Sequence, residues 1–212
     1  MGKRVAYENL IIDLYIFDKL KRPSANMSTA KIIYLYEDEL FKENMIGAHY
    51  KMIRYRWGPY NNSIGTHLKN LAANGFLNSK EKYYDKAEKD VLIYFKNKKT
   101  RDFLKNIDEL IEDYNSIFNA LDDIIEEYGD LNAEELKEFI YSLEYTGQKN
   151  QRIIDYQMLR TILDPDSLRW TKLNFWLDEE WYDTIEILLN PDLRIELEIG
   201  IKNAQSGKFS QL

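Results

Sequence analysis

Hydrophobic side chains recur every three or four residues along most of the chain, which is the spacing of amphipathic α-helices. The pattern predicts a helix over residues 7–20. A second helix is expected from Ser28, whose side chain can cap it, with Lys31 where a capping box has Glu or Gln. Over residues 48–55 the pattern becomes short, aromatic and alternating, which predicts a strand.

A turn is expected directly after this strand, because glycine permits unusual φ values and proline presets the second position of a turn. Its residues are Trp57, Gly58, Pro59 and Tyr60. A third helix is expected over residues 62–74, with Gly75 just beyond its end. Residues 77–95 then predict a two-stranded wing with a charged tip. This order of elements is typical of a winged helix.

Apolar residues at helical spacing continue over residues 100–128 and predict one long helix that ends at Gly129. Asn132 is expected to cap a further helix that continues to about residue 145. Residues 147–150 have the composition of a linker.

Beyond this linker we expect a short helix over residues 153–163, a break at Pro165 and a final helix from Pro191 to Asn203. The sequence therefore predicts a mainly α fold with a small β wing. The expected layout is a domain over residues 1–146, with a winged-helix-like part at 5–96 and a helical body at 98–146, followed by a helical C-terminal extension at 147–212.

The composition suits a folded core, since 44% of the 212 residues are hydrophobic and 14% are aromatic. There is no cysteine, which excludes disulfides, thiolate nucleophiles and cysteine-ligated metals. Charges interrupt every apolar run, and so we expect no membrane span, no signal peptide and a cytoplasmic location.

The charge of −7 is unevenly distributed. Residues 44–80 contain no carboxylate but carry five cations, namely Lys51, Arg54, Arg56, Lys69 and Lys80. This segment could pair with the acidic helices of the chain itself, contact DNA or bind a partner. The candidate DNA contacts are Arg54, Arg56 and Lys69, which are too few for tight binding by an acidic protein.

Several motifs occur in the order found in a known family. They are Lys31-Ile32-Ile33-Tyr34-Leu35-Tyr36, the segment Arg56-Trp57-Gly58-Pro59-Tyr60, the pair Leu68 and Leu71, the exit Asn74-Gly75-Phe76-Leu77, and Tyr128-Gly129-Asp130-Leu131 followed by Glu134-Glu135-Leu136. Over residues 5–145 the chain resembles the Panacea domain family, which comprises the SocA-like and YwgA-like proteins.

This resemblance implies an antitoxin of a bacterium or phage that neutralises its toxin by direct binding. Members of the family neutralise diverse toxins, including alarmone-synthetase-like enzymes that modify tRNA, and one branch acts as a protease adaptor. The expected partner is a basic, nucleotide- or RNA-handling toxin, bound by a homo-oligomer or within a heterotetramer. A winged-helix transcription regulator and a protease adaptor are the alternatives.

We expect no enzymatic activity, since the sequence has no nucleophile elbow, phosphate-binding loop or dinucleotide fingerprint. His49 and His67 stand 18 residues apart and lack the spacing of metal ligands, so neither a metal nor another cofactor is expected.

Tyr128 is the leading candidate for partner binding, because it stands among carboxylates beside a helix end. It could plug the active site of a nucleotide-handling toxin, or it could continue the apolar stripe of the core. The other candidates are Glu126, Glu127, Asp130, Tyr114 and Tyr141. The stretch from Trp170 to Trp181 could close the core or form an exposed interface.

Overall fold

The computed structural model describes the backbone of residues 4–84 and 88–205. The chain is mainly α with small β-sheets, as expected. It divides into two compact units, Met1–Trp176 and Leu177–Leu212. The expected boundary after residue 146 differs from this division, because residues 147–176 contribute strands to the sheets of the first unit.

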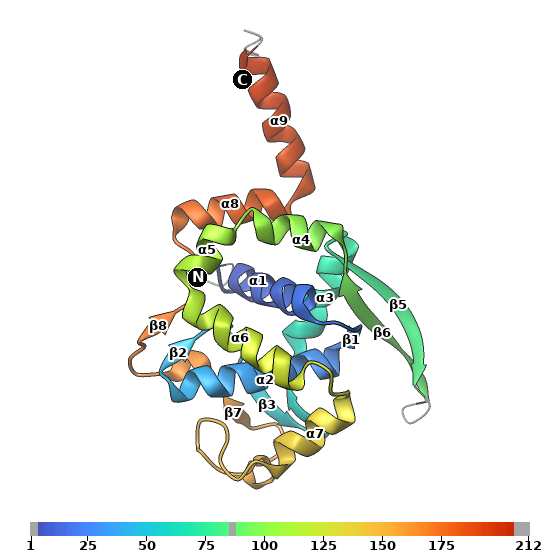
Figure 1. Cartoon of the computed structure of the whole chain (residues 1–212), viewed down its shortest axis with the longest axis vertical. Helices are drawn as coiled ribbons and strands as arrows, with labels where there is room; N and C mark the ends of the chain where they lie inside the picture. Colours follow the sequence, from blue (N-terminus) through green and yellow to red (C-terminus); the bar gives the residue numbers. More distant parts are fainter. Residues whose placement is uncertain (1–3, 85–87, 206–212) are drawn as a thin grey trace. The chain divides into compact units, whose positions relative to one another are not determined.

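Helix α2 (Asn26–Lys42) is central to the first unit and contacts α3, α6, α7 and strand β4 (Figure 1). Every residue from Thr29 to Asp38 is buried. The helix begins after Ala25, whose side chain forms no capping hydrogen bond, so the expected cap at Ser28 is wrong. Packing on all sides, rather than a cap, therefore stabilises this helix.

Helix α3 (Asn62–Ala73) and a three-stranded sheet adjoin α2, and helix α1 (Arg4–Lys19) packs on α3 and on this sheet. The sheet has the order β1-β6-β5, with β1 at Ser24–Ala25, β5 at Leu77–Tyr84 and β6 at Lys89–Lys96. Figure 1 shows β5 and β6 as a long antiparallel hairpin that extends to one side of the helices. Both predicted wing strands are present, whereas residues 85–87 of the expected tip lie outside the described part.

A second sheet has the order β4-β3-β7 and includes β3 (Met52–Tyr55), β4 (Gly58–Tyr60) and β7 (Thr161–Leu163). The expected turn over Trp57–Tyr60 is wrong as placed, because the turn is only Arg56-Trp57 and the next three residues pair with β3. Two further short strands, β2 (Met45–Ile46) and β8 (Leu173–Asn174), pair in parallel.

The long helix expected over residues 100–128 is three helices in the structure, α4 (Lys98–Lys105), α5 (Asp108–Asp113) and α6 (Asn115–Tyr128). At the first break the Asn106 side chain donates a hydrogen bond to the Asp102 carbonyl, 2.6 Å away. At the second break Tyr114 leaves helical geometry, with φ −107° and ψ 30°. Its hydroxyl donates to the Trp176 carbonyl at 3.0 Å, and this distant contact accounts for the break.

Helix α7 (Ala133–Ser142) begins at a capping box, as expected from Asn132, because the Asn132 and Glu135 side chains cap reciprocally. The predicted linker at 147–150 is wrong. The Gly147 amide donates to the Asp38 carboxylate, and the Gln148 amide donates to the Ile162 carbonyl at 2.8 Å. The segment is therefore fixed to α2 and β7.

The helix expected over 153–163 is a 3₁₀ turn at Ile153–Asp155 followed by β7. The second unit contains α8 (Glu179–Leu189) and α9 (Pro191–Gln205), and α9 begins at Pro191 as predicted. Among the described residues, no helix combines the length and the apolar composition needed to cross a bilayer.

Candidate partner-binding surface

The β3–β4 hairpin is built around Gly58. Tyr55 pairs with Gly58 across a two-residue turn, and Gly58 adopts φ +107°, a value that side-chain-bearing residues rarely take. A Cβ on Gly58 would lie 3.3 Å from Lys31 Cε and 4.0 Å from a ring atom of Tyr141. Glycine therefore lets the hairpin lie directly against α2 and α7.

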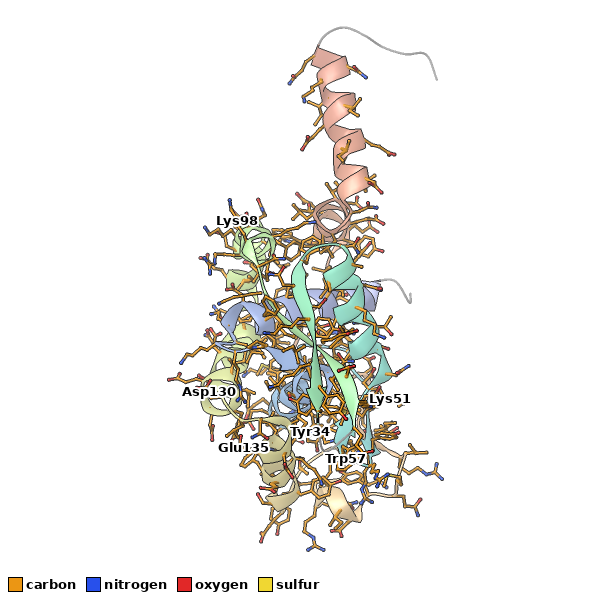
Figure 2. All side chains as sticks on the ribbon, turned by 90° about the vertical axis from the view of Figure 1, so that its right-hand side faces the viewer. Tyr34, Lys51, Trp57, Lys98, Asp130 and Glu135 are labelled. Atoms are coloured by element: carbon orange, nitrogen blue, oxygen red, sulfur yellow. The ribbon has the colours of Figure 1, made fainter. Side chains whose placement is uncertain are left out.

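Trp57 projects from the turn and is 50% exposed. The Arg56 guanidinium lies 5.3 Å and the Lys137 amine 5.1 Å from the Trp57 ring system, so two cations flank one indole. Lys137 also lies 5.6 Å from the Tyr141 ring. Figure 2 shows where Trp57 lies on the first unit.

The buried side chain of Lys31 lies next to Gly58 of this hairpin. Lys31 is almost fully buried, and its amine donates to the Met27 carbonyl at 3.1 Å. Burial, and to a lesser extent the nearby Lys137, lowers the pKa of Lys31 to about 8. Binding of an anionic group near Lys137 and Lys31 would thus be favoured electrostatically.

Exposed apolar side chains of β3 and of the segment that leads into β7 extend the surface. Tyr55 is 41% exposed and packs on Tyr60 at a centroid distance of 5.3 Å. Met158 and Leu159, 50% and 61% exposed, lie beside β3, because the Leu159 amide donates to the Arg54 carbonyl at 2.8 Å. We define the hairpin surface as Tyr55, Arg56, Trp57, Lys137, Met158, Leu159 and Arg160.

The cations of the hairpin surface have no acidic partner in the part of the chain that the structure describes. Arg56, Lys137 and Arg160 form no ion pair with any described residue. Two carboxylates of the segment around β7 are already engaged, since Asp164 pairs with Lys51 at 2.6 Å and Asp155 pairs with Arg152 at 3.0 Å. Arg54 donates instead to the Tyr156 carbonyl.

For the described residues, pairing of the basic segment with acidic residues of the chain itself is limited, and Lys51 pairs with Asp164 at 2.6 Å. None of their ion pairs joins residues 44–80 to the acidic helices at 98–130, and Lys69 is exposed on α3. The hairpin surface is left with surplus positive charge beside apolar groups.

The structure separates the residues expected to bind a partner. Tyr128 is partly buried and packs on Phe139 at a centroid distance of 4.6 Å, while burial, followed by the adjacent Glu127, raises its pKa to about 12. Tyr114 packs on Phe175 at the opposite end of α6, about 20 Å away for a 14-residue helix. Only Tyr141 adjoins the hairpin surface.

The acidic candidates Glu126, Glu127 and Asp130 are exposed. In Figure 2, Asp130 and Glu135 lie on one side of the first unit, whereas Lys51 lies on the other. Lys51, a cation of the basic segment that does not belong to the hairpin surface, thus lies away from the acidic end of α6.

The contact with Phe139 supports the core role of Tyr128. We expect Tyr128→Ala to lower the free energy of unfolding by about 1–3 kcal/mol, since a partly buried aromatic pair is lost. Partner binding by the folded protein should be unchanged. Circular dichroism melts and a binding assay on the same preparation check both statements, and weak binding by a variant with normal stability would restore the plug role.

The two histidines have different partners. Tyr50 donates its hydroxyl proton to buried Asp13 at 2.7 Å and lies 2.6 Å from His67 Nδ1, which connects α1 to α3. His49 contacts Asp166 through Nδ1 at 2.6 Å and the Phe175 carbonyl through Nε2 at 3.2 Å. Within the described residues, no group of three or more His, Asp or Glu side chains could hold a metal ion.

The contacts of His49 predict a pH effect on stability. Burial lowers its pKa, but the hydrogen bond and charge of Asp166 outweigh burial, so its pKa lies above 6.5. The resulting stabilisation is complete below the unfolded-state pKa and is lost as pH rises through the folded-state pKa. We expect Asp166→Asn to destabilise the protein more at pH 6 than at pH 8. Melting temperatures of both proteins across this range test it, and an equal difference at both values would contradict it.

Sequence reasoning identified Arg56 and Trp57 but missed Lys137, Met158, Leu159 and Arg160. Met158 and Leu159 fell in a stretch expected to be helical, and only the pairing of this stretch with β3 shows that they border the hairpin. The available signal was their apolar character between the polar residues Gln157 and Arg160. When the chain is compared with family models, curated proteins and solved structures, no match is found.

Proposed function

We propose that this protein is an antitoxin that neutralises a cognate toxin in the cytoplasm by direct binding. The observation that carries the proposal is the hairpin surface, where exposed aromatic and apolar side chains lie beside cations that pair with no carboxylate of the described residues. The motif Trp57-Gly58-Pro59-Tyr60, one of those that carry the resemblance to the Panacea family, lies in the same hairpin.

The composition of this surface suits a protein interface. Tryptophan, tyrosine and arginine are enriched among the residues that dominate binding energies. Here Trp57 and Tyr55 belong to a hairpin paired on both sides of β3, so little conformational entropy is lost on binding. The surplus cations favour an acidic patch on the toxin next to an apolar pocket for Trp57.

The acidic end of α6 has a different role in this proposal. Glu126, Glu127 and Asp130 attract a basic, nucleotide- or RNA-handling toxin at long range and raise the association rate, while the hairpin surface supplies the contact. Neutralising one of these carboxylates should therefore affect association mainly at low salt.

The test uses the genes that flank the coding sequence of this protein. Each is expressed alone and together with the protein, and growth is measured. We expect one product to arrest growth alone, to be tolerated in the presence of this chain and to co-purify with it. If no flanking product is toxic or co-purifies, the proposal fails.

A winged-helix DNA-binding regulator is the second candidate. The order α1, β1, α2, α3, β5, β6 and the sheet order β1-β6-β5 favour it. However, Lys69 is the single cation in the sequence of α3, and the chain carries a charge of −7.

We accordingly expect no sub-micromolar binding to duplex DNA at about 0.15 M salt, where exposed charges are screened beyond about 8 Å. Fluorescence anisotropy with duplexes from the upstream region of the gene measures this affinity. A tight complex that weakens steeply with salt and is abolished by Lys69→Ala would favour the regulator instead.

A further inference from the structure

The outer edge of β5 is an open strand edge. The sheet order β1-β6-β5 places β5 at one end, and Figure 1 shows it as the strand of the β5–β6 hairpin that lies farther from the helices. In an antiparallel strand, every second residue directs its N–H and C=O groups away from the neighbouring strand. Within the described residues, no hydrogen bond reaches the outer edge of Leu77–Tyr84, so these main-chain groups remain available.

This edge is long and regular. β5 has 8 residues, and its pairs with β6 continue from Leu77 to Tyr84 without a register shift. Every residue after Leu77 is exposed, and no proline interrupts the strand. Short length, proline, a bulge or a covering segment usually prevents an edge from pairing with another chain. β5 has none of these, and its pairing is restricted only by its charged side chains.

The two faces of the β5–β6 hairpin carry opposite charge. Side chains alternate between the faces of a strand, and cross-strand partners share a face. We define the lysine face as Asn78, Lys80, Lys82, Tyr84 and Lys89. No carboxylate of the two strands lies on it, because Glu81 and Asp90 belong to the opposite face. Lys80 and Lys82 form no ion pair with a described residue, and the Lys82 amine lies 5.6 Å from the Tyr84 ring.

We propose that β5 binds an extended segment of another protein as an additional strand, with acidic side chains at alternate positions of that segment along the lysine face. An extended chain offers main-chain donors and acceptors at the spacing that an open strand edge requires. Opposite charges on directly opposed residues stabilise such a pair. This binding does not depend on the antitoxin role, because any protein with such a segment fits the edge.

A second copy of the chain does not fit this edge. Two β5 strands that pair antiparallel about a two-fold axis form one continuous sheet, which places the lysine face of one copy beside the lysine face of the other. Lys80 and Lys82 would then approach lysines, and Glu81 would approach Glu81 of the other copy. Like charges on opposed residues destabilise a strand pair. The lysines therefore oppose self-pairing and favour an acidic strand.

Titration of the full chain with a synthetic peptide tests the proposal. The probe is a blocked peptide of alternating threonine and glutamate, as long as β5, and the amide signals of the isotope-labelled chain are followed by NMR. We expect saturable shifts centred on Leu77–Tyr84 at peptide concentrations up to about 1 mM. The double variant Lys80→Glu, Lys82→Glu should raise the dissociation constant at least about tenfold, because attractive charge pairs become repulsive.

The double variant Lys105→Glu, Lys172→Glu is the matched control, because both lysines are exposed and lie outside this sheet. It changes the net charge by the same amount and should leave the affinity for the peptide unchanged. Far-UV circular dichroism should show that both double variants retain the fold. Equal weakening by the two double variants overturns the proposal, since net charge alone would then attract the peptide.

Two methylated peptides test the main-chain pairing itself. In one, every threonine amide is N-methylated, and in the other every glutamate amide. Since a strand directs its amides alternately to its two sides, only one of these peptides lacks the donors that face β5. That peptide should lose binding and the other should keep it, whereas equal affinity of the two overturns the proposal. Unshifted signals of Leu77–Tyr84 with the unmethylated peptide also overturn it, and if duplex DNA shifts them instead, the β5–β6 hairpin contacts nucleic acid.

Discussion

Gly58→Val is expected to cost about 1–3 kcal/mol of stability through backbone strain alone, because φ is +107° at this position. The added side chain would also approach Lys31, whose Cε lies 3.3 Å from the Cβ position. Crowding of this kind typically lowers the free energy of unfolding by about 1–3 kcal/mol more. Since each kcal/mol shifts the melting temperature of a protein of this size by about 2–4 °C, the melt should move by several degrees.

Gly75→Val is the matched control for this variant. Gly75 also has a positive φ, +72°, but a Cβ there would meet no atom within 4 Å. It should therefore show the strain without the crowding, and its melting temperature should fall less than that of Gly58→Val. Equal shifts would mean that the hairpin can move away from Lys31 at no cost. An unchanged melt of Gly58→Val would show that the hairpin does not require glycine.

Local sequence signals predicted those elements whose boundaries depend on neighbouring residues. The cap at Asn132, Gly75 just beyond the end of α3 and the apolar run at 91–95 in β6 all act over a few residues. The structure confirms each of them. Such signals are readable from one sequence because the physical cause lies within the same segment.

The elements that were mispredicted depend on contacts between distant segments. Tyr114 interrupts a continuous helical pattern because its hydroxyl donates to Trp176, 62 residues away in sequence. The supposed linker at 147–150 is ordered because the Gly147 amide donates to Asp38 on α2. Neither contact can be inferred from the local sequence. The apolar spacing therefore predicted one continuous helix over residues 100–128, and the composition predicted a linker at 147–150.

The candidate surface was predictable only in part for the same reason. Arg56 and Trp57 adjoin each other in sequence, and the motif around them is recognisable. Lys137 reaches the same indole from α7, and Leu159 reaches β3 through a backbone hydrogen bond. Arg56 and Trp57 could therefore be predicted from the sequence, whereas the side chains around them could be identified only from the fold.

Trp57→Ala is expected to remove most of the binding to the toxin under the proposed function. Loss of a central aromatic residue typically weakens an interface by at least about 2 kcal/mol, which is roughly a 30-fold increase in Kd. Stability should change by only about 1 kcal/mol, since the half-exposed indole contributes mainly its contacts with Arg56 and Lys137. Binding and stability should therefore separate in this variant.

Trp170→Ala supplies the control, because Trp170 is also exposed, at 64%, but does not belong to the hairpin surface. It should leave both protection from the toxin and Kd unchanged. Titration calorimetry with the purified toxin and the growth assay measure the two effects in parallel. If Trp57→Ala binds normally while Trp170→Ala does not, the interface lies near residue 170 and the hairpin surface has another role. If both variants bind normally, neither tryptophan contacts the toxin, and the acidic end of α6 becomes the surface to mutate.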